Sequence, residues 1–326
     1  MRKRYAIAIV GATGLIGRNF LRIIEKSDLP VDRIELFASD KSEGKKLKFR
    51  GQNEIVKKLD ENCFKGLDFV FFSAGKEVAL KYAPIAEKEG ATVIDNSSAF
   101  RSFPDIPLII PEINFDEIYK TERKIIANPN CSTIQAILPL TKLNEKYGLK
   151  RLIITTYQAV SGCGQKGIND LTECRLGKKQ KFFSINIAEN CICKIGEVEK
   201  DGYTDEEKKA YYETRKIFGN DISVSATCVR VPIENCHGVS VEAQFETDPD
   251  IEDAIEKISQ TEGVKLKNLP YQKYASGRNE VFVGRIRKSA AFENGIAYYC
   301  VADNTLRGAA YNAVKIAMKI IGNLKN

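Results

Sequence analysis

Residues 5–17 are YAIAIVGATGLIG, and this stretch decides the fold. The run Tyr5–Val10 is apolar throughout, as expected of a core strand. Glycines follow at positions 11, 14 and 17, and we interpret Leu15–Lys26 as a helix. Glycines in such a turn let the backbone approach a pyrophosphate closely, and the helix N-terminus presents amide hydrogens to the phosphates. We therefore expect a dinucleotide-binding loop, rather than a plain tight turn, formed by Gly11, Ala12, Thr13, Gly14, Leu15, Ile16 and Gly17.

The first half of the chain continues this alternation of short apolar strands and helices. The order strand–helix–strand is typical of a parallel sheet with helices on its faces, that is, of a Rossmann-type domain. We expect strands at Tyr5–Val10, Ile34–Ser39, Phe69–Ser73, Thr92–Asp95 and Lys124–Ala127, and helices at Leu15–Lys26 and Val78–Glu89.

Longer strands follow after about residue 150, and several of them alternate apolar and polar residues. This alternation is typical of an antiparallel sheet with one partly solvated face. The fold class is therefore α/β, with a Rossmann-type parallel-sheet domain and an α+β domain whose sheet is mainly antiparallel. Here we expect strands at Leu152–Gln158, Ser223–Val231, Val239–Glu246, Val281–Lys288 and Ala297–Asp303, and helices at Asp205–Phe218, capped by Gly219, and Leu306–Leu324.

The length of 326 residues fits two domains of about 150 residues each. Asn128-Pro129-Asn130 interrupts the last strand of the first half before a new helix, and we expect the boundary there. The prediction is a dinucleotide-binding domain of residues 1–130, joined by the C-terminal helix at about 305–326, and a second domain of residues 131–304.

Composition excludes several classes of protein. Hydrophobic residues make up 43% and charged residues 29% of the chain, which argues against a disordered or collagen-like protein. No apolar run approaches the roughly 20 residues of a membrane helix, so no membrane partner is expected. The net charge of +7 is dispersed among acidic residues, which argues against nucleic acid and fits an anionic small-molecule substrate.

The cysteine and histidine counts narrow the chemistry further. Nine cysteines, an odd number, and no secretory signal indicate reduced thiols in the cytoplasm. With one histidine in the chain, no metal site is expected.

Cofactor choice depends on the loop after the second predicted strand, Ser39-Asp40-Lys41-Ser42. Ser39, Lys41 and Ser42 suit the 2′-phosphate of NADP, whereas Asp40 suits the free 2′-hydroxyl of NAD. Side chains alternate in direction at the end of a strand, so Ser39 and Lys41 should face one side and Asp40 the other. We therefore expect NADP; the alternative is an ordinary solvated loop.

The sharpest chemical signal is NPNCSTIQ at residues 128–135. Cys131 stands where a helix is expected to begin, and the unpaired amide hydrogens of a helix N-terminus stabilise a thiolate. Most cysteines are small buried hydrophobes, which is our interpretation of Cys63, Cys228 and Cys300. The position of Cys131 instead indicates a nucleophile.

The motif RVPIENCH at residues 230–237 supplies two further groups. His237 is the natural proton shuttle near neutral pH, and Arg230 is a natural fork for a substrate carboxylate. A lone histidine is more often structural, but its pairing with a candidate thiolate favours catalysis. Glu213 and Lys216 are three residues apart, and by spacing alone they suit a surface salt bridge.

Taken in order, the motifs resemble those of the bacterial type of aspartate-semialdehyde dehydrogenase over nearly the whole chain. The cysteine and arginine–histidine motifs are specific, whereas the glycine loop is not. The motifs are GATGLIG at 11–17, SSAFR at 97–101, IPEIN at 110–114, NPNCSTIQ at 128–135, TYQAVSG at 156–162, ETRKI at 213–217, RVPIENCHG at 230–238, ADN at 302–304 and GAA at 308–310.

The resemblance implies a reaction and a site. The reaction is reductive dephosphorylation of L-4-aspartyl phosphate to L-aspartate 4-semialdehyde with NADPH, in the biosynthesis of lysine, threonine and methionine. Cys131 would be the nucleophile, His237 the acid/base and Gln158 the residue that orients the thioester-forming intermediate. Arg230 would bind the substrate α-carboxylate and Glu213 its amino group. The phosphate pocket would consist of Arg101, Asn130 and Lys216, and further cofactor contacts would come from Ser161, Gly162 and Asn304.

The resemblance also makes the second domain the catalytic and dimerisation domain of a homodimer or homotetramer, with inorganic phosphate as a second small-molecule partner. Some positions depart from the family pattern without removing a catalytic group: Cys163, Cys236, Gly238, Leu306 and Arg307. The alternatives left open are N-acetylglutamyl-phosphate reductase, malonyl-CoA reductase, glyceraldehyde-3-phosphate dehydrogenase and a regulatory protein that binds the cofactor without catalysis.

Overall fold

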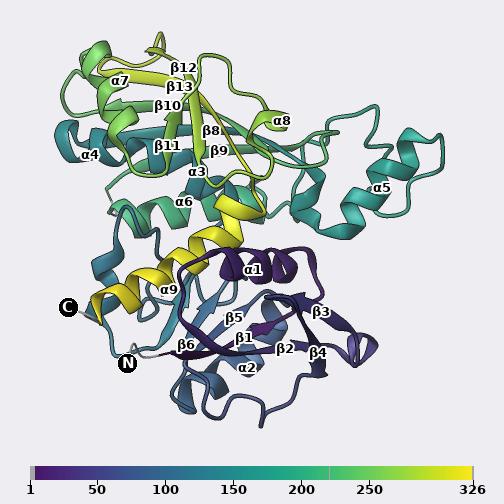
Figure 1. Ribbon diagram of the computed structural model, residues 1–326. Coiled ribbons are helices and arrows are strands. Elements are labelled where there is room, and N and C mark those ends of the chain that lie inside the picture. Colours follow the sequence, from purple (N-terminus) through teal and green to yellow (C-terminus); the bar gives the residue numbers. More distant parts are fainter. Residues whose placement is uncertain (1–3, 220, 325–326) are drawn as a thin grey trace. The chain divides into compact units, whose positions relative to one another are not determined.

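The protein is represented by a computed structural model, which describes residues 4–219 and 221–324 (Figure 1). The described residues form two compact units. The first unit comprises the chain up to Pro129 together with the residues from Ala309 onward, and the second runs from Asn130 to Gly308. Each unit is built around a sheet of its own.

In the described part of the first unit, seven strands form one sheet in the order β3-β4-β2-β1-β5-β6-β7. Neighbouring strands are parallel except in the β3–β4 hairpin, which confirms the expected Rossmann-type sheet. The elements of this unit are β1 (Tyr5–Val10), α1 (Leu15–Lys26), β2 (Val31–Ala38), β3 (Lys46–Phe49), β4 (Gln52–Lys58), β5 (Phe69–Phe72), α2 (Lys76–Lys88), β6 (Thr92–Asp95), β7 (Ile125–Ala127) and α9 (Tyr311–Asn323).

The turn between β1 and α1 depends on its glycines. Gly11 has a φ of 86°, and a Cβ atom there would lie 2.9 Å from the backbone of Ser73. A Cβ atom on Gly17 would lie 2.2 Å from the carbonyl oxygen of Gly11, so α1 can pack this closely against the loop only without a side chain. Gly14 is the N-cap residue of α1, so no side chain caps the first amides of this helix.

Both faces of this sheet are buried. On one face, Ile7 and Phe71 of the sheet join Phe20 of α1 and Ile316 of α9 in a single apolar core. On the other face, α2 packs against β5, β6 and β7. Figure 1 shows α1 and α9 side by side on one side of the sheet and α2 on the opposite side. Burial on both faces explains why the central strands are continuous apolar runs.

Two features of this unit correct the sequence-based expectations. β2 ends at Ala38, and Asp40–Ser42 form a 3₁₀ turn in which the amide of Ser42 donates to the carbonyl of Ser39 at 2.8 Å. The strand alternation assumed for Ser39–Lys41 is therefore wrong, because a 3₁₀ turn repeats every three residues. In addition, β3 and β4 form a hairpin where no strand was expected. Its strands are mostly exposed, so they lack the apolar run that marks a core strand.

In the described part of the second unit, six strands form a mixed sheet in the order β11-β12-β13-β10-β8-β9. The pairs β12–β13, β13–β10 and β10–β8 are antiparallel, as expected, and the two outer pairs are parallel. The elements are α3 (Cys131–Ile137), α4 (Thr141–Tyr147), β8 (Leu149–Gln158), α5 (Gln165–Arg175), α6 (Asp205–Phe218), β9 (Ser223–Arg230), β10 (His237–Phe245), α7 (Ile251–Gln260), β11 (Val264–Leu266), α8 (Gln272–Ala275), β12 (Val281–Lys288) and β13 (Gly295–Ala302).

Helix α6 has the bounds predicted for it, because both of its ends carry local signals. At the start, the Thr204 hydroxyl accepts from the amide of Glu207, and the Glu207 carboxylate accepts from the amide of Thr204. At the end, Gly219 has a φ of 128° and donates its amide to the carbonyl of Arg215 at 2.9 Å. α6 packs against β9 and α3 and so helps to place the start of α3.

One face of the second sheet is covered and the other is largely open. α3 and α6 pack against it on one side, where Leu152 and Ile154 of β8 are buried. On the opposite side, Ile153 is 40% exposed and Tyr157 is 38% exposed. α8 covers only the end of this side, where Ala275 packs with Phe282.

The predicted C-terminal helix is divided in two. Leu306–Ala310 form a short π-helical turn, and only Tyr311–Asn323 are α-helical. The carboxylate of Asp303 accepts hydrogen bonds from the amides of Thr305 and Leu306, at 2.9 Å and 3.2 Å. Within the turn, a Cβ atom on Gly308 would lie 2.5 Å from the Cβ of Cys131. Such widened turns often occur at functional sites, and a regular helix repeat does not reveal them.

Candidate active site

Three adjacent strands of the second unit bring three predicted site residues to one end of its sheet. Gln158 and Arg230 are the last residues of the parallel strands β8 and β9, and they are paired in register. His237 begins β10, which runs antiparallel to β8 and pairs with it from Gly238 opposite Tyr157. This strand starts two residues earlier than predicted. Because β8 lies between β9 and β10, Gln158 lies between Arg230 and His237 at the sheet end.

Cys131 is the first residue of α3, where the sequence placed a helix start. Asn130 is the N-cap residue, and its Oδ1 accepts hydrogen bonds from the amides of Ser132 at 2.8 Å and Thr133 at 3.4 Å. This corrects one part of the sequence argument, because these two amides are not unpaired. The helix dipole still favours a thiolate at Cys131. The amides of Ser132 and Thr133 do not contribute hydrogen bonds to it, because both donate to the side chain of Asn130.

Two hydrogen bonds attach α3 to the strand ends. Gln158 Nε2 donates to the hydroxyl of Ser132 at 2.5 Å, and Gln135 Nε2 donates to the carbonyl of His237 at 3.0 Å. The close approach of Gly308 completes the surroundings of Cys131. The structure therefore brings Cys131, Gln158 and His237 into one cluster within the second unit.

The protonation state of His237 is set by its surroundings. Its Nδ1 accepts a hydrogen bond from the amide of Ala159 at 3.0 Å, and its Nε2 has no hydrogen-bond partner among the described residues. Burial, assisted by the charge of Arg230 and opposed by Glu206, lowers the pKa of His237 to about 3. His237 is thus a neutral imidazole with its proton on Nε2, not a group that titrates near neutral pH as the sequence suggested.

Arg230 is 4% exposed, and its NH1 donates to the carbonyl of Ala159 at 2.6 Å. Gly162 leaves room for this guanidinium, because a Cβ atom there would lie 2.8 Å from NH1 and 3.4 Å from Cε1 of His237. The backbone of Ala159 thus contacts both Arg230 and His237. This second-unit arrangement suits Arg230 for binding an anion beside His237.

Helix α6 places two acidic side chains in contact with Asn130, the residue before Cys131. Glu213 is buried, and its Oε2 accepts from the backbone amide of Asn130 at 2.5 Å, so the interpretation of Glu213 as part of a surface pair is wrong. Two turns earlier, Glu206 contacts Asn130 and Gln158. Sequence reasoning missed Glu206, because an acidic residue in the first turn of a helix is ordinary. Lys216 is half-buried on the same helix.

Ser161 and Asn304, predicted to contact the cofactor, form a buried network. Their side chains are hydrogen-bonded to each other at 3.0 Å, and Asn304 Oδ1 accepts from the amide of Cys236 at 3.0 Å. Cys236 has a φ of 72°, a conformation that favours glycine, so this bond holds a strained residue directly before His237. Gly238, on the other side of His237, has no space for a side chain, since a Cβ atom would lie 1.9 Å from the hydroxyl of Tyr299.

In the first unit, the glycine loop and the loop after β2 form a second candidate site. Ser42 is buried, and its hydroxyl accepts from Thr13 Oγ1 at 3.2 Å and from Lys45 Nζ at 3.3 Å. Ser39 and Lys41 are exposed. Asp40 forms an ion pair with Lys58 at 3.1 Å. Lys45 was not singled out from the sequence; it lies three residues after Ser42, and the fold brings Thr13 to the same hydroxyl.

Arg101 also belongs to the first unit, where its NH2 donates to the carbonyl of Asn96 at 3.1 Å. The other predicted substrate residues, Asn130, Glu213, Lys216 and Arg230, belong to the second unit.

The remaining cysteines differ from Cys131 in their settings. The eight other cysteines form no disulfide in the described chain. Burial raises the pKa of Cys228 to about 12 and also raises the pKa of Cys236 and Cys300. Cys191 and Cys193 are exposed. Within residues 4–219 and 221–324, no three histidine, cysteine or acidic side chains are arranged to hold a metal ion. None of the described helices is long and apolar enough to span a membrane.

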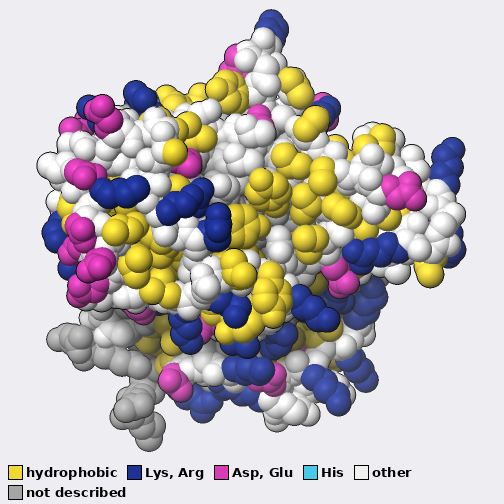
Figure 2. All heavy atoms as spheres, turned by 90° about the horizontal axis from the view of Figure 1, so that it is seen from above, with side chains coloured by type: hydrophobic (Ala, Val, Ile, Leu, Met, Phe, Trp, Pro, Cys, Tyr) yellow, Lys and Arg dark blue, Asp and Glu magenta, His cyan; other side chains and the backbone are white. Residues whose placement is uncertain are grey.

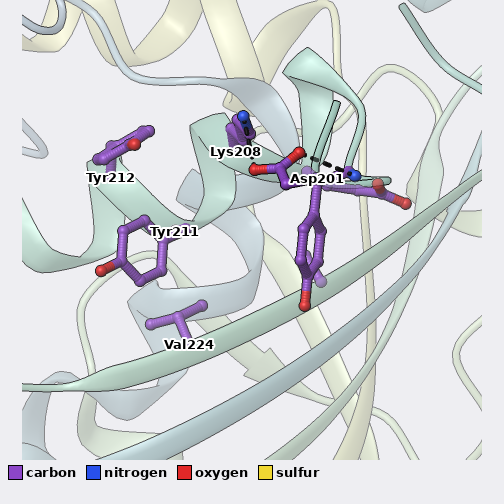
Figure 3. Close-up of a pocket in the computed structure, with 8 residues that line it drawn as sticks. Asp201, Lys208, Tyr211, Tyr212 and Val224 are labelled. Carbon is purple, nitrogen blue, oxygen red and sulfur yellow. Dashed lines mark hydrogen bonds and ion pairs between the residues drawn. The ribbon is translucent and has the colours of Figure 1, made fainter. Parts of the chain in front are cut away.

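A cavity of about 230 Å³ lies between α6 and β9 (Figure 3). Tyr203, Tyr211, Tyr212 and Val224 are among its lining residues, and an ion pair of Lys208 with Asp201 lies at its edge. The lining includes none of the residues predicted to act in catalysis. This cavity is therefore distinct from the candidate active site.

Comparison with known proteins agrees with this architecture. Residues 6–121 match the model of the semialdehyde dehydrogenase NAD-binding domain, and residues 140–307 match that of the semialdehyde dehydrogenase dimerisation domain. The chain therefore belongs to the semialdehyde dehydrogenase family.

Relatives of known name define its place within that family. An aspartate-semialdehyde dehydrogenase from Aquifex aeolicus is 46% identical over 97% of this chain and 98% of its own length. One from Bacillus subtilis is 40% identical over 95% of this chain and 96% of its own. The crystal structure of aspartate semialdehyde dehydrogenase II from Vibrio cholerae superimposes with a TM-score of 0.95 at 40% identity, covering 98% and 99% of the two chains. These findings place the chain with the aspartate-semialdehyde dehydrogenases and do not favour the alternatives.

Proposed function

We propose that the protein reduces L-4-aspartyl phosphate to L-aspartate 4-semialdehyde with release of inorganic phosphate, using NADPH. The observation that carries this proposal is the convergence of Cys131, Gln158, Arg230 and His237 at one sheet end. A structure of the Vibrio cholerae relative at 40% identity is a complex with ASA. In this chain, Cys131 supplies a nucleophile, Arg230 a guanidinium that can bind a carboxylate, and Gln158 and His237 hydrogen-bonding groups.

The first half of the reaction is acyl transfer to Cys131. The thiolate attacks the acyl carbon, the carbon–oxygen bond to phosphate breaks, and phosphate leaves with the electron pair while a thioester forms. The dipole of α3 supports the thiolate. Arg101, Asn130 and Lys216 are proposed to stabilise the departing phosphate, as the resemblance implies. The side chain of Asn130 is already engaged as the helix cap, so its share is to hold α3 in place.

Recognition of the amino-acid part of the substrate is assigned to Arg230 and Glu213. A guanidinium forms two parallel hydrogen bonds with a carboxylate, and burial strengthens both. Glu213, also buried, offers negative charge for the α-ammonium group. Opposite charges at these two places would select an α-amino acid and disfavour an N-acetylated substrate, which lacks the ammonium group.

The second half is reduction of the thioester. When bound, NADPH supplies the hydride. As negative charge develops on the carbonyl oxygen, the Nε2–H of His237 is the group available to stabilise it by hydrogen bonding. Collapse of the resulting thiohemiacetal breaks the carbon–sulfur bond, frees the aldehyde and returns Cys131 to its thiolate form.

The first unit fits a dinucleotide phosphate. Gly11 and Gly17 let the turn between β1 and α1 close tightly, because a Cβ atom on either would collide with the backbone, and the first amides of α1 have no side-chain cap. For the 2′-phosphate, Ser42, Thr13 and Lys45 form a hydrogen-bonded group, and Ser39 and Lys41 lie on the same short loop. The ion pair with Lys58 offsets the charge of Asp40, the feature that would otherwise favour NAD. NADP is therefore the proposed cofactor, with Ser161, Gly162 and Asn304 retained as predicted contacts.

We assign residues 1–130 with 305–326 to the cofactor domain and residues 131–304 to the catalytic and dimerisation domain. The partner is proposed to be a second copy of the chain, in a homodimer or homotetramer, seated on the open face of the second sheet. This face carries Ile153, Thr155 and Tyr157 on β8. Figure 2 shows hydrophobic side chains gathered between lysines and arginines on the side of the molecule it displays. The cytoplasm remains the predicted location, on the basis of the reduced cysteines.

One assay tests the activity. The purified protein is given NADP and phosphate with either aspartate semialdehyde or N-acetylglutamate semialdehyde, and NADPH formation is followed. We expect turnover with aspartate semialdehyde, dependence on phosphate and little turnover with the acetylated substrate. Faster turnover of the acetylated substrate would contradict the proposal.

A further inference from the structure

Glu206 is a largely buried carboxylate within the candidate active site. It lies in the first turn of α6, and its side chain is 12% exposed. Its Oε1 accepts hydrogen bonds from Asn130 Nδ2 at 2.9 Å and from Gln158 Nε2 at 3.2 Å. Its Oε2 accepts one from Lys209 Nζ at 3.1 Å. One carboxylate therefore joins the residue before the nucleophile to the residue assigned to orient the intermediate.

This carboxylate is ionised under ordinary conditions. Burial by itself favours the protonated form, but the charge of Lys209 and the hydrogen bonds from Asn130 and Gln158 outweigh it and lower the pKa of Glu206 to about 2. An ionised carboxylate accepts hydrogen bonds and donates none. It therefore requires the nitrogen atoms of both amides to point toward it and their oxygen atoms to point elsewhere.

The consequence for each amide can be followed in the structure. The oxygen of Asn130 faces the amides of Ser132 and Thr133, where it caps α3. The nitrogen of Gln158 donates to Glu206 and to the hydroxyl of Ser132, so both of its hydrogens are used. The oxygen of Gln158 accepts no hydrogen bond from the residues that the structure describes. It is the part of this side chain left for the substrate.

We propose that Glu206 is a positioning residue of the reaction, which holds the Gln158 amide so that its oxygen, and not its nitrogen, faces the substrate. This inference rests on the proposed function. Gln158 then accepts a hydrogen bond from an N–H or O–H group of the bound amino acid or its intermediate. Stabilisation of the developing oxyanion, which requires a donor, is left to Nε2 of His237. The two neighbouring side chains thus have complementary roles.

The test variant is Glu206→Gln. Its amide has nearly the same shape but can donate as well as accept, so the Gln158 amide is free to turn over. We expect kcat to fall on the order of 10- to 100-fold, the scale of effect seen when a reacting group is misplaced. The matched control is Asp205→Asn, on the same helical turn. Asp205 also contacts Lys209, at 2.9 Å, but neither amide, and wild-type kcat is expected.

A double-mutant cycle with Gln158→Ala shows whether Glu206 acts through Gln158. In the Gln158→Ala background, Glu206→Gln should cost little further activity, because the oriented amide is already absent. Additive losses, or a kcat for Glu206→Gln equal to that of the Asp205 control, would overturn the inference. Glu206→Asp keeps the carboxylate and should retain more activity than Glu206→Gln. If thermal unfolding shows that Glu206→Gln does not fold, Glu206→Asp takes its place in the double-mutant cycle.

The wild-type assay with aspartate semialdehyde is run first. Failure of the wild type would contradict the proposed function, whereas a difference confined to the variants bears on Glu206 alone.

Discussion

The backbone amide of Ala159 donates a hydrogen bond to Nδ1 of His237 over 3.0 Å, and this bond places the imidazole proton on Nε2. Ala159 follows directly after Gln158 at the end of β8, while His237 begins β10. The neighbouring strand therefore selects the tautomer of the only histidine in the chain. In this state His237 offers a hydrogen-bond donor, which stabilises developing negative charge but does not remove a proton from Cys131 through Nε2.

We predict that His237 remains neutral in the free protein across the range in which histidine normally titrates. Because the chain has one histidine, ¹⁵N-labelling of histidine alone reports on this ring by NMR without further assignment. One protonated and one bare nitrogen should be seen, with shifts that do not change between about pH 5 and 8. A titration within that range would contradict the assigned tautomer and charge state.

The same shift in pKa should affect stability. The native pKa of about 3 lies below the ordinary value of 6.5, so the unfolded chain binds an additional proton between these values. The free energy of unfolding should therefore decrease as the pH falls below about 6.5, by up to about 1.4 kcal/mol per pH unit from this group. His237→Gln removes the titrating group, and its unfolding free energy, compared with wild type from pH 7 to about 5, isolates the contribution. Parallel curves for the two proteins would exclude it.

Cys131→Ala should abolish turnover while NADP binding is retained, because the nucleophile lies in the second unit and the glycine loop in the first. Iodoacetamide at neutral pH should inactivate the protein at the rate at which Cys131 is alkylated, as measured by mass spectrometry of peptides. Burial raises the pKa of Cys228, Cys236 and Cys300, so these thiols should react slowly.

Cys191 and Cys193 are exposed and provide the control for this labelling. Serine at both positions should leave the rate of inactivation unchanged. Equal labelling of all nine cysteines in the native protein would count against an activated thiol at Cys131.

Arg230→Lys should raise the Michaelis constant for aspartate semialdehyde sharply. Lysine retains the charge but not the planar fork that binds a carboxylate in two places. In the wild type, NH1 of Arg230 donates to the Ala159 carbonyl at 2.6 Å while the rest of the guanidinium is available to the substrate. The single ammonium group of lysine cannot make both sets of contacts. The expected loss in kcat/KM corresponds to about 1.5 to 3 kcal/mol, the range for hydrogen bonds to charged groups. Unchanged kinetics would place Arg230 outside the substrate site.

Lys41→Ala and Lys45→Ala should each reduce the preference for NADP over NAD, measured as the ratio of the two kcat/KM values. Both lysines lie on the loop after β2, and Lys45 already contacts Ser42 at 3.3 Å. Lys48→Ala, which removes an exposed lysine from the adjacent β3, should leave the ratio unchanged. Equal use of NAD and NADP by the wild type, or an unchanged ratio in both test variants, would show that this loop does not bind the 2′-phosphate.

Ile153→Glu should weaken self-association by placing a charge on the open face of the second sheet. Size-exclusion chromatography with light scattering should show a smaller species than the wild type at the same concentration. Leu80→Glu is the matched control, because Leu80 on α2 is also 40% exposed. If both variants keep the wild-type mass, the open sheet face is not the interface.

Local sequence alone determined those helices and strands whose ends are marked by residues close to them in the chain. Tyr5–Val10 is apolar at every position and is buried on both faces of a parallel sheet, and α6 has a capping box at one end and glycine at the other. Gly11 and Gly17 mark the turn because no side chain fits there. The start of α3 at Cys131 was equally predictable, because Asn-Pro-Asn ends a strand and supplies an N-cap. In each case the physical signal lies within a few residues of the structure it specifies.

Tertiary structure decided the chemistry of those residues. Glu206 contacts Asn130 and Gln158, Gly308 packs against Cys131, and Ser42 contacts Thr13, although the members of each pair are distant in the chain. His237 shows the difference most directly. Its sequence position suggested a proton shuttle with an ordinary pKa, but burial and the amide of Ala159 make it a neutral donor. Charge state depends on desolvation and on neighbours in space, and a linear pattern of residues carries neither.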